Sequence, residues 1–126
     1  MIGRVTGMLT GAAMLAVTPA IAHHSFAMFD QENAIEVEGV VQEFRFTNPH
    51  TFILLAVQDK DGGTKVWNLE GRSPSGLVRE GWSSKSIKPG DELRLTIWPL
   101  RSGAPGGAWE PNQISFRDGK PVALAP

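Results

Sequence analysis

A pair of adjacent histidines carries the sharpest chemical signal in this sequence. His23 and His24 directly follow Ala20-Ile21-Ala22, whose small residues fit the cleavage positions of a secretory signal peptide. Cleavage after Ala22 would make His23 the N-terminal residue. Its α-amine and its ring Nδ1 could then chelate one Cu(II) ion, because both are nitrogen donors when neutral. The pair therefore predicts a metal site at the mature N-terminus.

His50 is the third and last histidine of the chain, and it would complete a histidine brace around copper. His24 offers a competing mode, in which the amine, a deprotonated amide and the second-position imidazole chelate Cu(II). The thioether of Met28 could add a soft ligand for Cu(I). It could equally be a core residue beside Phe26 and Phe29, and we expect the core role to be the commoner one.

A purely structural role for the histidines stays open. A terminal histidine pair can belong to a frayed tail, or can form hydrogen bonds that fix the N-terminal segment to the domain. Asn48-Pro49 makes a rigid turn before His50, because asparagine favours turns and proline fixes φ. That rigidity suits a metal ligand, and it also suits a turn in which the Asn48 side chain caps a strand and His50 bonds a nearby carbonyl.

Trp109 marks a second candidate site. It lies in residues 99–112, a segment with three prolines and three glycines. Such a loop often lines the ligand face of a small barrel, so Trp109 could contact a saccharide, a small solute or a partner protein. A loop tryptophan also commonly plugs the end of a barrel. The other tryptophans, Trp67, Trp82 and Trp98, are expected in the core.

The elements that position these residues are mainly strands. Alternating or continuous apolar runs predict strands at residues 35–46, 52–57, 64–69, 92–98 and 113–116. The first strand changes the parity of its apolar residues near Gly39, which predicts a bulge or bend there. The second is apolar on both faces and is expected to be covered on both. Ser73-Pro74 begins a short helix whose apolar face would hold Leu77, Val78 and Trp82.

This element order predicts a five-stranded barrel of the oligonucleotide/oligosaccharide-binding (OB) type, with one short helix between strands three and four. An immunoglobulin-like sandwich is the chief rival, but it needs about seven strands and no such helix. We divide the chain into a signal peptide at residues 1–22, an N-terminal arm at 23–34 and the barrel domain at 35–126. One domain suits the length of 126 residues.

The composition excludes several classes of binding site and bears on the expected partners. The chain has no cysteine, which excludes disulfides, thiolate zinc sites and iron–sulfur clusters. Twelve basic residues against 13 acidic ones give a net charge of −1, so we expect no nucleic-acid partner. The apolar run of the signal peptide favours cleavage and export to a bacterial periplasm with no stable membrane anchor afterwards, a retained anchor being the alternative.

The sequence resembles a family of small exported bacterial proteins of unknown function. The segments that carry the likeness are His23-His24-Ser25-Phe26, Thr47-Asn48-Pro49-His50, Trp67, Gly81-Trp82 and Lys88-Pro89-Gly90-Asp91. The resemblance implies export and a single small β domain, and it lends no catalytic residue.

Three functions remain. We expect a periplasmic metal-binding protein, with copper as the expected metal and His23, His24 and His50 as its candidate ligands. The alternative is a non-catalytic OB-type module that binds a saccharide, a small solute or a partner protein through Trp109. An oxygen-activating copper enzyme is the minor third option. The enzyme option would need a surface that binds a substrate. A periplasmic protein partner is also compatible with the sequence.

Overall fold

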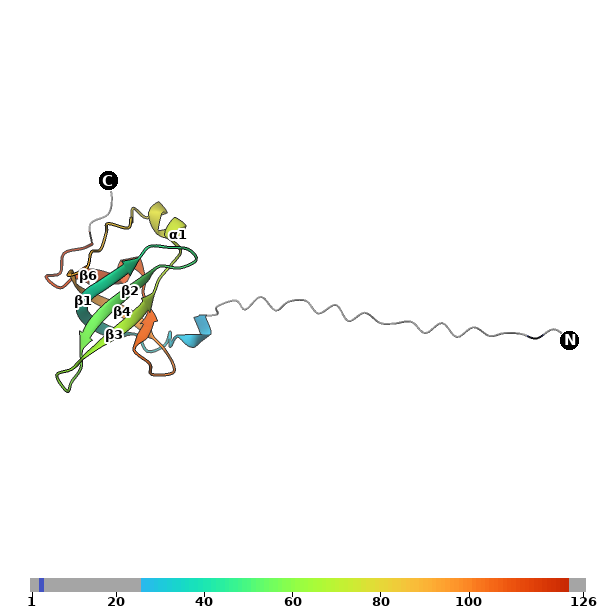
Figure 1. The fold of residues 1–126 in the computed structure, drawn as a ribbon, viewed down its shortest axis with the longest axis horizontal. Helices are drawn as coiled ribbons and strands as arrows, with labels where there is room; N and C mark the ends of the chain where they lie inside the picture. Colours follow the sequence, from blue (N-terminus) through green and yellow to red (C-terminus); the bar gives the residue numbers. More distant parts are fainter. Residues whose placement is uncertain (1–2, 4–25, 123–126) are drawn as a thin grey trace.

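The computed structural model describes Gly3 and residues 26–122, and in the latter range it shows a small β-barrel with a short helix at one end (Figure 1). The strands are β1 (Ile35–Arg45), β2 (Phe52–Gln58), β3 (Thr64–Glu70), β4 (Glu92–Pro99), β5 (Gly106–Ala108) and β6 (Ile114–Phe116). The helices are α1 (Pro74–Arg79) and the 3-10 turns η1 (Phe26–Met28) and η2 (Pro111–Gln113). None of the helices in the described part is long and apolar enough to cross a membrane.

The barrel is a closed ring of five strands in the order β1-β2-β3-β5-β4, because β4 also pairs with β1. All pairs in the ring are antiparallel except β3 with β5. β6 lies outside the ring and extends the sheet along the first half of β4. With α1 between β3 and β4, this arrangement confirms the predicted OB-type barrel.

β1 is bent and pairs with two neighbouring strands. Its first half pairs with β4 from Ile35 to Val40, and its second half pairs with β2 from Val40 to Arg45. The expected irregularity is present, and the register shifts between Val41 and Glu43, directly after the stretch from Gly39 to Val41 where the parity of the apolar residues changes. Gly39 has another role, since a Cβ there would lie 2.3 Å from the carbonyl oxygen of Ala56. The glycine allows a close approach of two strands.

The core fills the barrel and extends to the helix end. Its fully buried members come from all the long strands and from the segments around α1: Val41, Ile53, Leu55, Leu69, Leu77, Ile87, Leu93, Leu95 and Ile97. Alternation is clear in β4, where Leu93, Leu95 and Ile97 are buried. In β2 only Ile53 and Leu55 are buried, so the expectation that this strand is covered on both faces is wrong. Its other face is half-buried on the outside of the barrel.

The helix forms where the sequence predicts it. The hydroxyl of Ser73 accepts a hydrogen bond from the Gly76 backbone at 3.4 Å, which caps the first turn. Leu77 and Trp82 pack into the core as expected. Val78 does not, since it is 57% exposed. Leu77 is the buried residue of α1, and Val78, the next residue along the helix, is rotated away from that face.

Residues 99–112 are more ordered than their composition indicates. Gly106 and Gly107 form β5 together with Ala108, and all three are buried. A Cβ at Gly107 would lie 2.5 Å from the Trp98 carbonyl oxygen, so a larger residue would not fit between β3 and β4. Glycines that resemble loop residues in the sequence therefore permit a tight strand insertion.

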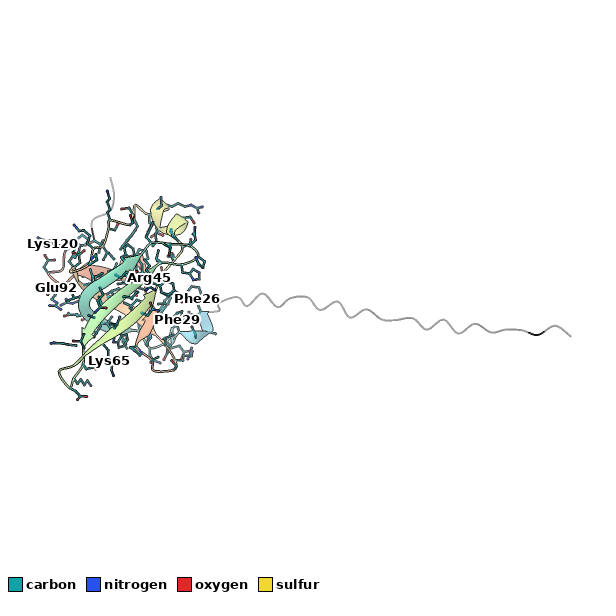
Figure 2. The ribbon with its side chains drawn as sticks, in the orientation of Figure 1. Phe26, Phe29, Arg45, Lys65, Glu92 and Lys120 are labelled. Carbon is teal, nitrogen blue, oxygen red and sulfur yellow. The ribbon has the colours of Figure 1, made fainter. Side chains whose placement is uncertain are left out.

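The described part of the N-terminal arm is attached to the end of β4. Phe29 is 5% exposed and forms a bridge with Leu100. The Asp30 amide donates to the Pro99 carbonyl at 2.8 Å, and the Arg101 amide donates to the Met28 carbonyl at 2.9 Å. Phe26 and Phe29 consequently lie on the side of the barrel away from Glu92 and Lys120 (Figure 2).

Candidate functional site

The arm, β3 and the segment after β5 enclose a cavity of about 350 Å³. We call it the arm cavity. Its apolar wall comes from Phe26, Met28, Phe29, Ala108 and Trp109, and its polar wall from His50, Glu70, Arg72, Ser73 and Glu110, with Gly71 and Gly76 completing it. The size falls in the usual range of small-ligand sites, and the mixed lining brings titratable groups against aromatic rings.

His50 contacts a carboxylate within this cavity. Its Nδ1 lies 2.5 Å from Oε1 of Glu70, and its side chain is about one-third exposed. Glu70 is the last residue of β3. Its backbone is held in turn, because the Trp109 amide donates to the Glu70 carbonyl at 2.9 Å. A carboxylate on Nδ1 fixes the orientation of the ring, as carboxylates do in carboxylate–histidine–metal arrangements.

Thr51 holds His50 in this position. It is fully buried, and its hydroxyl donates to the Arg72 carbonyl at 2.8 Å. Its amide donates to the same carbonyl at 3.0 Å, while its own carbonyl accepts from the Gly71 amide at 2.8 Å. Three hydrogen bonds thus attach the residue after His50 to the segment after Glu70. The turn at Asn48-Pro49, whose peptide bond is cis, is therefore followed by a rigid attachment to β3.

Arg72 links two acidic residues at the cavity edge. Its Nε donates to Oε2 of Glu110 at 2.9 Å, and its Nη1 also bonds Glu80. The hydrogen bond to Glu110, with a smaller contribution from Glu80, raises the pKa of the Arg72 guanidinium above its ordinary value. The lining of the arm cavity thus holds two carboxylates, those of Glu70 and Glu110, against the one guanidinium of Arg72, an excess that favours a cation.

Trp109 lies in the core and also lines the arm cavity. It is 2% exposed, and its ring centroid is 5.3 Å from that of Trp82 and 6.4 Å from that of Phe44. The indole Nε1 is buried and has no hydrogen-bond partner in the described part of the chain. Its role in ligand contact stays a prediction, and a ligand in the cavity would reach only one edge of this ring.

Met28 is placed differently from the core position that we considered commoner. Its side chain is 41% exposed at the wall of the arm cavity, so that expectation is wrong. Phe26 is also exposed, at 58%, and only Phe29 of this group enters the core. The short η1 turn of Phe26–Met28 holds no buried residue, and the buried Phe29 directly follows it.

The structure brings together two residues that the sequence assigned to different hypotheses, His50 and Trp109. His23 and His24 lie outside the described residues. Glu70 and Arg72 were missed, because nothing in the sequence distinguishes them from other charged residues at strand ends. Within residues 26–122 no group of three or more His, Cys, Asp or Glu side chains could by itself hold a metal ion. A metal site here would need donors from outside this set.

A larger, more open groove of about 750 Å³ lies beside the first half of β1. Two of its charged lining residues are paired, since Arg117 Nε lies 3.7 Å from Oε2 of Glu38, and Arg94 from outside the lining lies 2.6 Å from Oε1 of Glu38. Trp67 lines it, but no histidine does. We therefore place the candidate site at the arm cavity, where an imidazole, a thioether and carboxylates meet.

Comparison with known proteins places the chain in a family. The model of DUF6152, a family of unknown function, matches residues 12–110. The chain belongs to this family. DUF6152 membership agrees with the predicted resemblance to proteins of unknown function, whereas export stays a prediction. A search of curated proteins finds no match to the chain.

Two solved structures resemble this DUF6152 protein in fold, and both are of Rim1, a mitochondrial single-stranded DNA-binding protein of S. cerevisiae. Each is 13% identical and covers 68% of this chain and 93% of its own, with TM-scores of 0.50 and 0.49. At this identity the first likeness shows the fold alone. The expectation that this DUF6152 chain has no nucleic-acid partner stays a prediction.

Proposed function

We propose that the protein binds copper at the arm cavity, through the N-terminal His23 of the processed chain and His50. The observation that carries the proposal is the place of Phe26. This residue follows His23 by three positions and lines the same cavity as His50. Three residues span at most about 10 Å. A segment of this length would let the α-amine and ring of His23 approach the cavity that holds His50.

The surroundings of His50 support a metal ligand. Glu70 holds its Nδ1 at 2.5 Å, and such a carboxylate raises the basicity of a ligating imidazole. The excess of carboxylates over guanidinium around the cavity attracts a divalent cation. In this proposal His24 is an alternate ligand or lies just outside the ligand set. The proposal also assigns the chain to the periplasm after removal of residues 1–22.

The test is a Cu(II) titration of the chain that begins at His23, followed by electron paramagnetic resonance. We expect one tightly bound ion with hyperfine structure from three nitrogens. His50→Ala should change that structure and weaken binding about tenfold or more, and a methionine retained before His23 should weaken it as well. The mass of the exported chain reports whether cleavage follows Ala22.

His24→Ala is the matched variant. If His24→Ala abolishes binding while His50→Ala has no effect, the metal is held by the terminal chelate alone and the role of His50 is wrong. If the retained methionine leaves the affinity unchanged, the terminal amine is not a ligand and the brace is overturned.

A small-solute function is the second candidate, because the arm cavity has the volume and the aromatic wall of a ligand site. Trp109→Ala is a poor test of it, since this residue is buried in the core and its loss would destabilise the fold. Phe26→Ala is the better variant, because Phe26 is exposed. Binding of glucose or N-acetylglucosamine, followed by tryptophan fluorescence and weakened by Phe26→Ala, would support this candidate. Unchanged fluorescence with both sugars would remove the saccharide option.

A further inference from the structure

We propose that Met28 and His50 form a binding site for Cu(I) in the arm cavity. This inference rests on the proposed function for the choice of metal, but its two donors both lie in the described part of the chain. The site would let the protein hold copper in its lower oxidation state with ligands different from those used for Cu(II).

The first support is the placement of the thioether. Methionine is usually buried, yet Met28 is 41% exposed at the cavity wall that it shares with His50. Its backbone is not free to move away. Arg101 donates its amide to the Met28 carbonyl at 2.9 Å and its Nε to the Ala27 carbonyl at 3.0 Å. The side chain therefore starts from a fixed point, and its three rotatable bonds let the sulfur adjust to an ion.

The second support is the match between donors and ion. A thioether is a soft, neutral ligand that selects Cu(I), and a neutral imidazole binds copper in either state. Mg²⁺ prefers oxygen donors, and Zn²⁺ binds thiolates, imidazoles and carboxylates rather than thioethers, so Met28 adds little to the binding of either ion. The pair is thus selective for a soft monovalent ion.

The third support is the polarity of the cavity. One wall of the cavity is apolar, because it is formed by Phe26, Phe29 and Trp109. An ion against this wall loses part of its hydration, and the free-energy cost of that loss is smaller for an ion with one charge than for an ion with two. Glu70 and Glu110 on the opposite wall provide the negative potential that a cation needs. These conditions favour Cu(I) over Cu(II) at the position between Met28 and His50.

The experiment is an anaerobic competition titration of the chain beginning at His23 against bicinchoninate, a coloured Cu(I) chelator. Met28→Leu keeps the size of the side chain and removes the sulfur, and it should weaken Cu(I) binding about tenfold or more while Cu(II) affinity is unchanged. Val66→Leu, at an exposed position on β3 outside the arm cavity, is the control and should leave Cu(I) affinity as it is.

Ag(I), which does not change oxidation state, gives a direct readout. One equivalent should shift the carbon-13 signal of the Met28 methyl group, and His50→Ala should reduce that shift. Unchanged Cu(I) affinity in Met28→Leu, or a methyl signal that does not move with Ag(I), would overturn the inference. A methionine retained before His23 separates the two proposals: loss of Cu(II) binding alone in that variant supports both, whereas equal loss of Cu(I) binding contradicts a separate Met28–His50 site.

Discussion

Gly71 lies directly against the indole of Trp109. A Cβ added at Gly71 would be 2.4 Å from both Cε2 and Nε1 of that ring, and 2.7 Å from Oγ1 of Thr51. No real Cβ occupies such a position. The absence of a side chain at Gly71 therefore lets Trp109 enter the core between β3 and α1, and the same contact shapes one wall of the arm cavity.

Gly71→Ala should accordingly destabilise the protein. The added methyl group has to displace either the indole or Thr51, both of them buried, which costs about 1 to 3 kcal/mol of unfolding free energy. Urea unfolding followed by tryptophan fluorescence measures it. Gly76→Ala is the control, because a Cβ there makes ordinary contacts, with Ser73 Oγ at 3.5 Å and Arg72 Cβ at 3.9 Å, and alanine favours the helix. Equal stability of the two variants would contradict the packing described.

Glu70→Gln should weaken Cu(II) binding without unfolding the barrel. Glutamine keeps the shape of the side chain but removes the charge that orients His50 through Nδ1. Loss of such a partner typically lowers metal affinity about tenfold to a hundredfold. Competition titration measures this change. Glu43→Gln removes an exposed carboxylate that pairs with Arg45 on β1, and it should have no effect on copper.

Phe29→Ala should release the arm and lower stability. Phe29 is buried against Leu100, and truncation of a buried phenylalanine costs about 3 kcal/mol or more. Hydrogen exchange should then rise at the Asp30 and Arg101 amides, which join the arm to the end of β4. Phe26→Ala, at an exposed position, should change stability by only about 0.5 kcal/mol. If amide exchange stayed the same in Phe29→Ala, Phe29 would not be the anchor.

Asp30 should make the stability of the arm depend on pH. Hydrogen bonds from the Asn33 side chain, and from the Glu32 and Asn33 amides, lower the pKa of Asp30 below its ordinary value. The ionised carboxylate is thus favoured in the folded chain. Its contribution is complete above the unfolded pKa of about 4 and is lost as the pH falls through the lower, folded pKa.

Carboxyl carbon NMR of Asp30 measures this pKa directly, and Asp30→Asn should remove its part of the acid sensitivity of unfolding. Asp118→Asn is the comparison, because the exposed Asp118 carboxylate accepts one hydrogen bond, from the Lys120 amide at 2.9 Å, against the three hydrogen bonds that Asp30 accepts. A pKa for Asp30 at or above the unfolded value would contradict the hydrogen bonds described.

The fold could be read from the sequence because each long strand alternates strongly. Leu93, Leu95 and Ile97 indicate which face of β4 is buried, and Ser73-Pro74 marks the start of α1. The local sequence pattern does not predict the environment of a residue where contacts with residues far along the chain determine it. Gly107 resembles a loop glycine until β3 and β4 are known to lie on either side of it, and Met28 resembles a core residue until η1 is known to turn its side chain outward.

The candidate site was less predictable than the fold. His50 was identified as a candidate because histidines are few, and Trp109 because of its loop. Their common cavity follows from the closure of the barrel, which brings β3 beside β5. Glu70 and Arg72 acquire their roles only through this pairing and through the hydrogen bonds of Thr51. The spacing of residues in the sequence does not predict those contacts.

The pairing of β1 with β4 also bears on how the chain avoids aggregation. A sheet with two long open edges has unpaired backbone N–H and C=O groups to which strands of other chains can bind. A closed ring pairs most of these groups within one molecule. In the described part, β3 pairs with β5 only from Asn68 to Glu70, so its first half keeps one open edge. That stretch is short and carries the exposed charge of Lys65, a combination that opposes intermolecular strand pairing. The closed ring thus limits the length of sheet edge that another chain could extend.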